Sequence, residues 1–260
     1  MSNMEFCYPN YLQTTTNVSI TIGSTTVANL FDGKSSTYYT SVGLNNDTTA
    51  CTIRIEFSGT KNVNRLVLEN INWKSFVIYY QSNTANKLTL LNAPTTTSEW
   101  STNSTTSMLL KFATVSASIF TLAATTTMVA NEEKEIGGLW FLEQVYSFTD
   151  NPEAKEYDPN IEQKQYKHEM SDGGAAVYFI QDNFKANIKR KFVSDSERQS
   201  LWSLYTYHSP LVFIPFPTGT SWDGGLWEVN WTDKFDFNQY YQNVKDNGFT
   251  GQIKLEETPK

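Results

Sequence analysis

Short segments in which apolar and polar residues alternate recur roughly every ten residues through the first half of the sequence. The segment CTIRIEFSG, residues 51–59, places Ile53, Ile55 and Phe57 on one face of a strand and polar residues on the other. A series of about eight such strands predicts a β-sandwich. The other segments are VNRLVLENI, FVIYYQS, KLTLLN, SMLLKFAT, SIFTLAA and LWFLEQVYSF.

Composition agrees with a mainly β protein and limits its functions. The 260 residues suffice for two β domains, each with its own core. The chain has 20 Lys and Arg against 27 Asp and Glu, a net charge of −7, which repels phosphate backbones, so we expect no nucleic-acid partner. The start, MSNMEFCYPNYLQ, lacks the pattern of a signal peptide, and no apolar run is long enough for membrane insertion. Cys7 and Cys51 are too few for a disulfide framework, and two buried thiols are favoured over a disulfide.

The pattern changes after an acidic stretch, TDNPEAKEYDPN, which holds two prolines and reads as a linker over 149–160. We therefore expect a first domain over 1–148 and a second over 161–260. In the second, AAVYFIQD and NFKANIKRKFV predict a hairpin, and SDSERQSLWSLYTYH predicts one helix. Ser194 and Glu197 have capping-box spacing there, and Leu201, Trp202, Leu204 and Tyr205 form an apolar stripe. Strands then return, which predicts a smaller antiparallel β domain with one helix.

The stretch ANLFDGKSSTYYTS, followed by IRIEFSG and VNRLVLENINWKSFVIYYQS, resembles the discoidin or galactose-binding-like family. Members typically show Asp-Gly, a short polar run, Thr-x-Trp, a strand that ends in Phe/Leu-Gly, and a further strand pair. The resemblance covers about residues 15–148 and implies an eight-stranded jelly-roll sandwich. The matching positions are Asp32, Gly33, Thr37, Tyr39, Phe57 and Gly59.

The same resemblance implies that Asp32 could hold a structural calcium ion, as the corresponding corner does in sugar-binding relatives. The later acidic ligand would fall near the last strand, where one register gives Gly138 and another Glu143. A hard cation needs six or more oxygens, and Asp32 is the one firm carboxylate, so a structural corner without metal is favoured and no other cofactor is expected.

Glycan binding is a further implication of the resemblance, because relatives stack exposed aromatic residues on sugar rings. The loop candidates are Tyr38, Asn45, Asn46, Trp73 and Trp100. Against this, the domain has no histidine, and Arg54 and Arg65 both lie inside predicted strands. A single Trp at a strand end is more often a core or interface anchor than a ligand platform.

Catalytic patterns are sparse, so we do not expect an enzyme. His168 and His208 are the only histidines, with no nucleophile or metal motif beside them. Acidic pairs such as Glu132–Glu133 and Glu256–Glu257 occur in polar runs and read as solvated. An unfamiliar carboxylate site that involves Asp32, Glu143 and Asp223 is the weaker alternative. The basic residues Lys185, Lys189, Arg190 and Lys191 predict a solvated strand face more than a contact with an acidic partner.

The region from about 136 to 260 loosely resembles tail and baseplate proteins of tailed bacteriophages. The segments that show this resemblance are KANIKRKFVSDSERQSLWSLYTYHSPLVFIPFP, LWEVNWTDKFDFNQ, GFTGQIKLEET and EKEIGGLWF. The resemblance implies a virion structural protein that is assembled in the host cytoplasm, binds itself and other tail proteins, and contacts host surface glycans through the jelly roll. The alternative is a carbohydrate-binding module protein without catalysis. The candidate interface residues are Trp202, Trp222, Trp227 and Trp231, although a core role is an equal alternative.

Overall fold

The computed structural model describes residues 3–8, 10–12, 18–20, 27–32, 37–81, 84–91, 98–169, 175–223, 225–239 and 248–258. The chain divides into two compact units, each built from separate stretches of sequence. The first unit comprises Met1–Ser2, Cys7–Gln144 and Pro215–Gly224, and the second Asn3–Phe6, Val145–Ile214 and Gly225–Lys260. The protein is mainly β with one α-helix, as expected. In the described residues, no helix is both long and apolar enough to cross a membrane.

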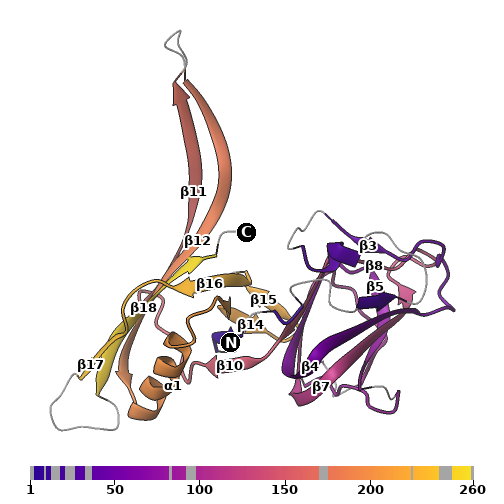
Figure 1. Ribbon diagram of the computed structural model, residues 1–260, viewed down its shortest axis with the longest axis horizontal. Helices are drawn as coiled ribbons and strands as arrows, with labels where there is room; N and C mark the ends of the chain where they lie inside the picture. The colour runs from indigo at the N-terminus through magenta and orange to yellow at the C-terminus, as the bar shows by residue number, and fades with distance from the viewer. Residues whose placement is uncertain are drawn as a thin grey trace. The chain divides into compact units, whose positions relative to one another are not determined.

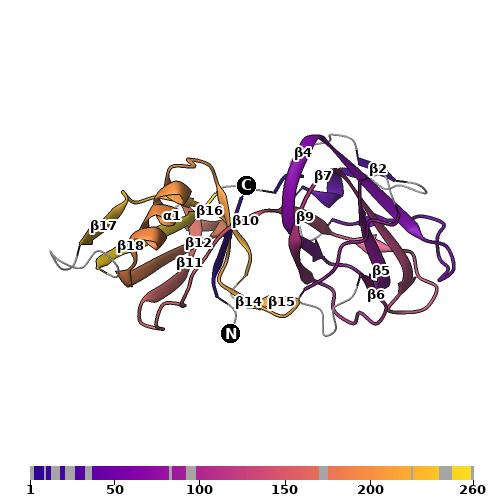
Figure 2. The ribbon, with the colours of Figure 1, turned by 90° about the horizontal axis from the view of Figure 1, so that it is seen from below.

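Two antiparallel sheets build most of the first unit (Figure 2). The larger has six strands in the order β2-β4-β7-β5-β6, with β9 paired to β4, and the smaller pairs β3 with β8. A short 3-10 helix, η1, covers Val27–Leu30. The strands are β2 (Val18–Ile20), β3 (Tyr39–Thr40), β4 (Cys51–Glu69), β5 (Trp73–Tyr80), β6 (Glu99–Trp100), β7 (Met108–Thr127), β8 (Glu135–Ile136) and β9 (Gly138–Leu142).

Two of these strands are much longer than the alternation indicated. The segments expected as four strands form β4, of 19 residues, and β7, of 20. The register between them shifts at Glu56/Lys61 and at Val63/Arg65. Such bulges bend a strand without ending it, and alternation on either side of a bulge looks like two strands. The predicted alternation itself is confirmed, since Ile53, Ile55 and Phe57 are all buried.

One hydrophobic core fills the first unit and draws on both halves of the long strands. It includes Ile53 and Phe57 before the bulges of β4, and Leu66 and Leu68 after them. Phe57 packs edge-on against Phe141 of β9 with ring centroids 5.5 Å apart. This arrangement is a β-sandwich, which confirms the predicted architecture of this half of the chain.

The first unit also contains a hairpin from late in the sequence. Strands β14 (Phe216–Thr218) and β15 (Ser221–Asp223) pair with each other, and the backbone N–H of Leu109 in β7 donates to the carbonyl of Thr220 at 2.8 Å. Residues 215–224 therefore belong to the sandwich unit rather than to the stretch 161–260 in which the sequence placed them.

An eight-stranded sheet dominates the second unit (Figure 1), with the order β10-β1-β13-β16-β18-β12-β11 and β17 paired to β18. Its core face carries Phe184, Ile188 and Ile253, all buried, and the aromatic rings of Phe6 and Phe213 pack 4.9 Å apart. The strands are β1 (Glu5–Cys7), β10 (Gln144–Ser147), β11 (Tyr157–Glu169), β12 (Ala175–Val193), β13 (Leu211–Ile214), β16 (Trp227–Trp231), β17 (Asp236–Gln239) and β18 (Phe249–Glu257).

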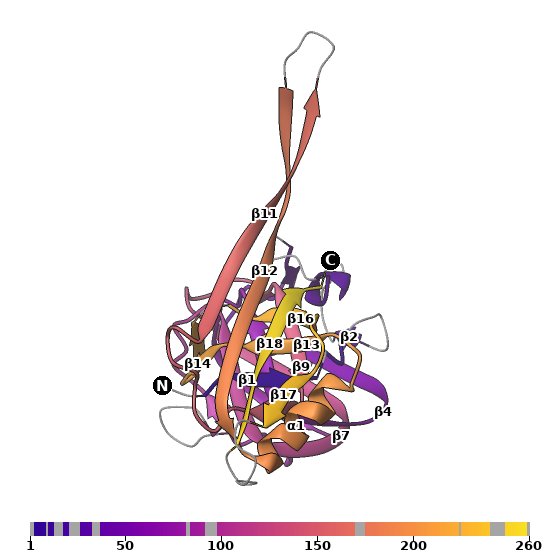
Figure 3. The same cartoon turned by 90° about the vertical axis from the view of Figure 1, so that its left-hand side faces the viewer.

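Strands β11 and β12 form a long ribbon that extends beyond the rest of this sheet (Figures 1 and 3). β12 pairs with β18 only from Lys185 to Val193, whereas it pairs with β11 from Ala175 to Ile188. The hairpin expected within 175–193 is wrong, because that stretch is a single strand whose hairpin partner is β11. The expected linker also differs, since residues 157–160 begin β11.

The predicted helix is confirmed as α1 (Asp195–Tyr205), with Ser194 as its N-cap, whose side chain accepts a hydrogen bond from the Glu197 N–H. Leu201 and Leu204 are buried as expected, but Trp202 is 50% exposed and so does not belong to the apolar stripe. Leu201, Leu204 and Tyr205 share one face of the helix because they are three and four residues apart, whereas Trp202 is turned about 100° away from Leu201.

Candidate functional site

The short β3–β8 sheet presents an exposed aromatic residue at one edge of the first unit. Tyr39 pairs with Ile136, and Thr40 pairs with Glu135. Tyr39 and Ile136 are fully buried, so Thr40 and Glu135 lie on the outer face. Tyr38, one residue before Tyr39, lies on that outer face and is 41% exposed. Its backbone is held by a hydrogen bond in which its carbonyl accepts from Asn29 Nδ2 at 2.8 Å.

A buried lysine holds the loop that follows β3. Lys134 is fully buried, and its Nζ donates to the backbone carbonyls of Leu44, at 3.1 Å, and Asn46. Its backbone N–H donates to Ser41 Oγ at 2.7 Å. We call the two stretches 41–50 and 127–135, which this lysine joins, the Lys134 loop cluster. The lysine fixes the shape of this cluster through backbone contacts, because an ammonium ion offers three donors.

Carboxylates strengthen the same loop cluster. Asp47 accepts hydrogen bonds from the N–H and the hydroxyl of Thr127, both at 3.1 Å. Burial opposes ionisation of Asp47, but the Thr127 hydrogen bonds prevail and lower its pKa. Glu133 accepts a hydrogen bond from the Gly43 N–H at 2.8 Å. Partial burial, together with the negative charges of Glu132 and Glu133, raises the pKa of Glu135.

The predicted glycan residues occupy different environments. Tyr38 is exposed, as a ligand platform requires. Trp73 is 1% exposed and packs beside Phe76, so it is a core residue and the prediction of a platform there is wrong. Trp100 is half-buried and stacks on Phe76, with centroids 6.1 Å apart and an interplanar angle of 6°. A ring at a strand end turned inward in both cases because Phe76 offers it an apolar neighbour.

The asparagines of the loop have different roles. Asn46 uses its side-chain oxygen within the loop, where it accepts from the Thr48 N–H, the Thr48 hydroxyl and the Thr49 N–H. Asn45 is exposed. Sequence reasoning missed Asn72, whose amide donates to the Glu133 carbonyl at 2.7 Å and accepts from the Glu135 N–H at 2.9 Å. It also missed Lys134, which stands in a run of charged residues that resembles a solvated loop.

The described residues do not fit a structural calcium ion at the corner. Asp32 is exposed and accepts a hydrogen bond from Thr37 Oγ1 at 2.7 Å, and Gly33 lies outside the described residues. Glu143, one of the two later acids considered, accepts from the Tyr11 hydroxyl at 2.8 Å. Across the described residues, no three His, Cys, Asp or Glu side chains gather into a potential metal site. Two carbonyls of the nearby loop bond instead to the Lys134 ammonium.

The two cysteines are buried, as predicted, and are not joined in a disulfide. Cys51 Sγ lies 3.9 Å from the Tyr39 hydroxyl. Burial raises the pKa of the Cys51 thiol, so this group stays protonated and unreactive at neutral pH.

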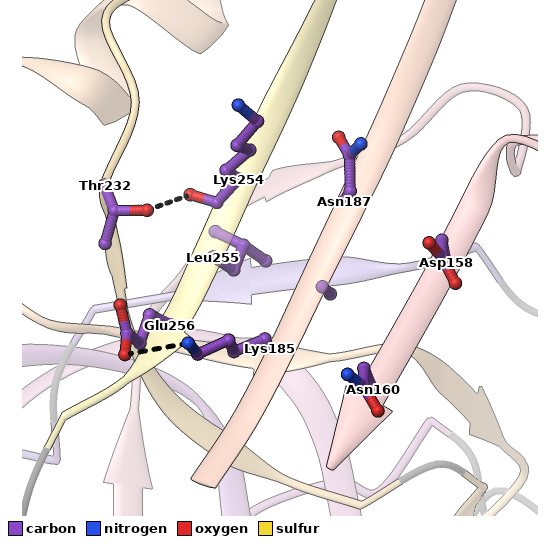
Figure 4. Close-up of a pocket in the computed structure, with 9 residues that line it drawn as sticks. Asp158, Asn160, Lys185, Asn187, Thr232, Lys254, Leu255 and Glu256 are labelled. Carbon is purple, nitrogen blue, oxygen red and sulfur yellow. Dashed lines mark hydrogen bonds and ion pairs between the residues drawn. The ribbon is translucent and has the colours of Figure 1, made fainter. Parts of the chain in front are cut away.

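A polar groove of about 310 Å³ lies on the open face of the sheet in the second unit (Figure 4). Three neighbouring strands supply its walls and floor. β11 contributes Asp158 and Asn160, β12 contributes Lys185 and Asn187, and β18 contributes Lys254 and Glu256.

Lys189 and Lys191 of β12 are exposed and the Lys185 side chain is 41% exposed, which agrees with the predicted solvated face, and two of the three form ion pairs. Lys185 Nζ lies 2.6 Å from Glu162, and the hydrogen bond between them raises the pKa of Lys185. Lys191 pairs with Glu156 at 2.8 Å. Arg190 faces the core side instead, where it pairs with Glu197 at 2.8 Å with both side chains largely buried.

Three of the four tryptophans predicted at interfaces have described side chains, and these three divide between exposed and packed positions. Trp202 is the exposed one, and its ring lies edge-on to Phe235 at 5.0 Å. Trp227 stacks on Phe184 with centroids 4.5 Å apart, and Trp231 is half-buried beside Phe235, so a packing role holds for both. Trp222 lies in β15, and its side chain is outside the described residues, as is that of His168. His208 is exposed at the end of α1.

No protein-family profile matches the sequence, and no curated protein matches it. Among solved structures, a chitosan-binding module from a chitosanase/glucanase of Paenibacillus sp. IK-5 is similar over 52% of this chain and 98% of that one, with 15% identity and a TM-score of 0.40. The module CpGH89CBM32-4 of Clostridium perfringens, in complex with GlcNAc-alpha-1,4-galactose, is similar over 52% and 94%, with 17% identity and a TM-score of 0.39. A pectin-binding module shows 19% identity over 49% and 91%, with a TM-score of 0.35. None of these three is a phage protein; each is similar to about half of this chain.

Proposed function

We propose that the protein is a non-catalytic binding protein whose sandwich unit recognises glycans at the β3–β8 edge. The observation that carries this proposal is the exposed Tyr38 on a rigid edge, next to polar groups that also face outward. An aromatic face stacks on the C–H face of a sugar ring, and adjacent hydroxyl and carboxylate oxygens hydrogen-bond its hydroxyls. Thr40 and Glu135 supply such groups on the same face.

The Lys134 loop cluster supports this proposal because it pre-organises the neighbouring loop. Loops that are ordered before binding lose less conformational entropy when a ligand arrives. Val42 and Val129 of this cluster are 51% and 62% exposed and add apolar surface, and Asn45 is also exposed. The sequence resemblance to the galactose-binding-like family points to the same class of ligand.

Binding of the full chain to an array of neutral, acidic and amino-sugar glycans tests the proposal. We expect a micromolar to millimolar affinity for at least one glycan, and at least a tenfold loss in Tyr38→Ala, on the order of 1.4 kcal/mol. The control is Tyr207→Ala, since Tyr207 is similarly exposed, at 39%, but lies in the second unit. Equal losses in both variants, or no binding to any glycan, would reject the proposal. Bound glycans should be recovered intact.

A second candidate function is assembly of a virion, as a tail or baseplate subunit of a tailed phage. The β11–β12 ribbon favours it, because in the described residues Ile161–Glu169 pairs only with β12 and lies beyond the stretch that β18 covers. A two-stranded ribbon is only marginally stable in water, and an unpaired strand edge is a template for another chain. The exposed Ile161, at 54%, and Trp202 on α1 add apolar surface.

Light scattering over a concentration series, with electron microscopy of the same samples, tests assembly. We expect rings or defined oligomers, and a shift toward monomer when 163–182 is replaced by a short turn, since Gln163 pairs with Asp182 and the buried Phe184 is then kept. A monomer at all concentrations, alone and with the other structural proteins of a virion, would reject this second candidate and leave glycan recognition.

A further inference from the structure

The polar groove of the second unit is built from positions that are distant in the sequence but aligned across three strands. Asn187 of β12 pairs in register with Asp158 of β11 on one side and with Lys254 of β18 on the other. The next row consists of Asn160, Lys185 and Glu256 in the same strand order. Figure 4 shows the Asn187 side chain between Lys254 and Asp158.

The four charged residues that line this groove, Asp158, Lys185, Lys254 and Glu256, sum to zero charge. Lys185 pairs with Glu162 at 2.6 Å and with Glu256 at 3.6 Å, and Lys254 pairs with Asp233 at 3.0 Å. These contacts draw both ammonium groups toward carboxylates of the protein. Asp158 adds a further negative charge to the wall. An anion such as phosphate would meet carboxylates, and a cation would meet two ammonium groups, so neither class matches the electrostatics.

Two amide oxygens of this face lack a hydrogen-bond partner among the described residues. They are the Oδ1 atoms of Asn183 and Asn187, which flank Lys185 on the same face of β12. Asn183 is fully buried, and its amide nitrogen donates to Glu256 Oε1 at 3.0 Å. A buried acceptor without a donor costs stability, so such groups in a folded protein call for a specific reason. Of the two, Asn187 lines the groove, and a rotation of its amide group toward the groove would let a ligand donate a hydrogen bond to its oxygen.

We propose that the polar groove binds a neutral, hydroxyl-rich ligand, a saccharide unit or similar polyol. Its hydroxyl groups donate to Asn187 and Asp158 and accept from the amide of Asn160. The volume of about 310 Å³ is at the lower end of the range for small-molecule sites, roughly 300–1,000 Å³, and suits a single ring. Among the described residues that line the groove none is aromatic, so hydrogen bonding rather than stacking determines the binding.

This groove lies in the second unit, whereas the proposed glycan edge lies in the first. The proposal for the groove does not depend on glycan binding at that edge. If both sites bind sugars, one chain carries two saccharide contacts of different chemistry, one with an aromatic face and one without. Two weak sites on one chain raise the overall affinity for a multivalent surface.

Saturation-transfer NMR with the full chain tests the proposal, with D-galactose, D-glucose, N-acetylglucosamine and glycerol as probes. We expect millimolar binding of at least one sugar, and at least a tenfold weaker binding in Asn187→Leu, which keeps the size of the side chain and removes its amide. Asp158→Ala, at an exposed strand position, should weaken binding severalfold. It also provides a test if Asn187→Leu fails to fold. The matched control is Lys189→Ala, on the same strand face but outside the groove.

The outcomes separate this proposal from the glycan edge. Tyr38→Ala should leave sugar binding at the groove unchanged, whereas Asn187→Leu should leave any binding at the Tyr38 edge unchanged. If Tyr38→Ala abolishes all sugar binding while Asn187→Leu and Asp158→Ala bind as the unchanged protein does, the proposal of a groove site is overturned and the Tyr38 edge is retained. Absence of binding for all four probes would also overturn it, as would competition by inorganic phosphate at equal concentration.

Discussion

The first unit buries a lysine completely and bonds it to backbone carbonyls, whereas the second unit leaves its groove lysines half-exposed and pairs them with carboxylates. Lys134 has no exposed surface, while the side chains of Lys185 and Lys254 are 41% and 48% exposed. The same residue type therefore performs two tasks. Burial turns the ammonium into a fixed structural link between loops, and exposure lets it balance charge on a surface where water screens each pair.

The largest expected effect follows from the removal of the buried lysine. Lys134→Met keeps the length of the side chain but leaves the carbonyls of Leu44 and Asn46 without this donor. Each unsatisfied buried acceptor costs about 1–3 kcal/mol, so we expect the first unit to lose roughly 4 kcal/mol. Urea unfolding monitored by tryptophan fluorescence measures the loss, with Lys74→Met at an exposed strand position as the control. Equal stability of the two variants would contradict the structural role of Lys134.

A buried ion pair in the second unit tests whether the loss of stability depends on burial or on which unit contains the residue. Arg190 pairs with Glu197 at 2.8 Å, with side chains 9% and 12% exposed, and the Tyr146 hydroxyl donates to the same carboxylate oxygen at 2.7 Å. Arg190→Met leaves a largely buried carboxylate without its cation, which costs about 3 kcal/mol. Thermal unfolding of the variant and of the unchanged protein measures this loss of stability. The double variant Arg190→Met/Glu197→Gln should recover much of the loss, and failure to recover would mean that packing dominates.

A smaller effect concerns pH at the Lys134 loop cluster. Partial burial and the charges of Glu132 and Glu133 raise the pKa of Glu135 above its usual 4.5. The folded state therefore binds this proton more tightly than the unfolded state. The stabilising contribution is present below pH 4.5 and is lost as pH rises through the raised value. Glu135→Gln should flatten this part of the curve in denaturant titrations at successive pH values. If the stability of the variant depended more steeply on pH than that of the unchanged protein, Glu135 would not be the group responsible for this dependence.

The smallest expected effect belongs to the exposed pairs of the groove. Lys185→Met removes the contacts with Glu162 and Glu256, but surface pairs contribute little to stability because water and salt screen them. We expect a midpoint in urea that does not differ measurably from that of the unchanged protein. A loss comparable to that of Lys134→Met would show that the contrast between the two regions does not depend on burial.

Sequence reasoning reached the β-sandwich and the helix because alternation and a capping signal are local. It divided β4 and β7 wrongly, since a bulge at Glu56/Lys61 depends on the partner strand. The exposed Tyr38 was found through a motif, but the burial of Trp73 beside Phe76 depends on tertiary packing. Lys134 was expected to be solvated because it lies in the charged run NEEKEIGG. The two carbonyls that accept hydrogen bonds from its ammonium group belong to residues 44 and 46, about 90 positions earlier in the chain. The groove could not be predicted because its lining residues are spread over the chain from Asp158 to Glu256.

The division of the chain into interleaved stretches limits how such a protein can be exchanged between genes. The sandwich unit takes in residues 215–224, and the second unit takes in residues 3–6. A single recombination breakpoint near residue 148 would separate the sandwich from its own β14–β15 hairpin and would detach β1 from the sheet beside β13. Inheritance of either unit alone would need several simultaneous joins. Two units that are interleaved in this way are therefore inherited together rather than exchanged by domain shuffling.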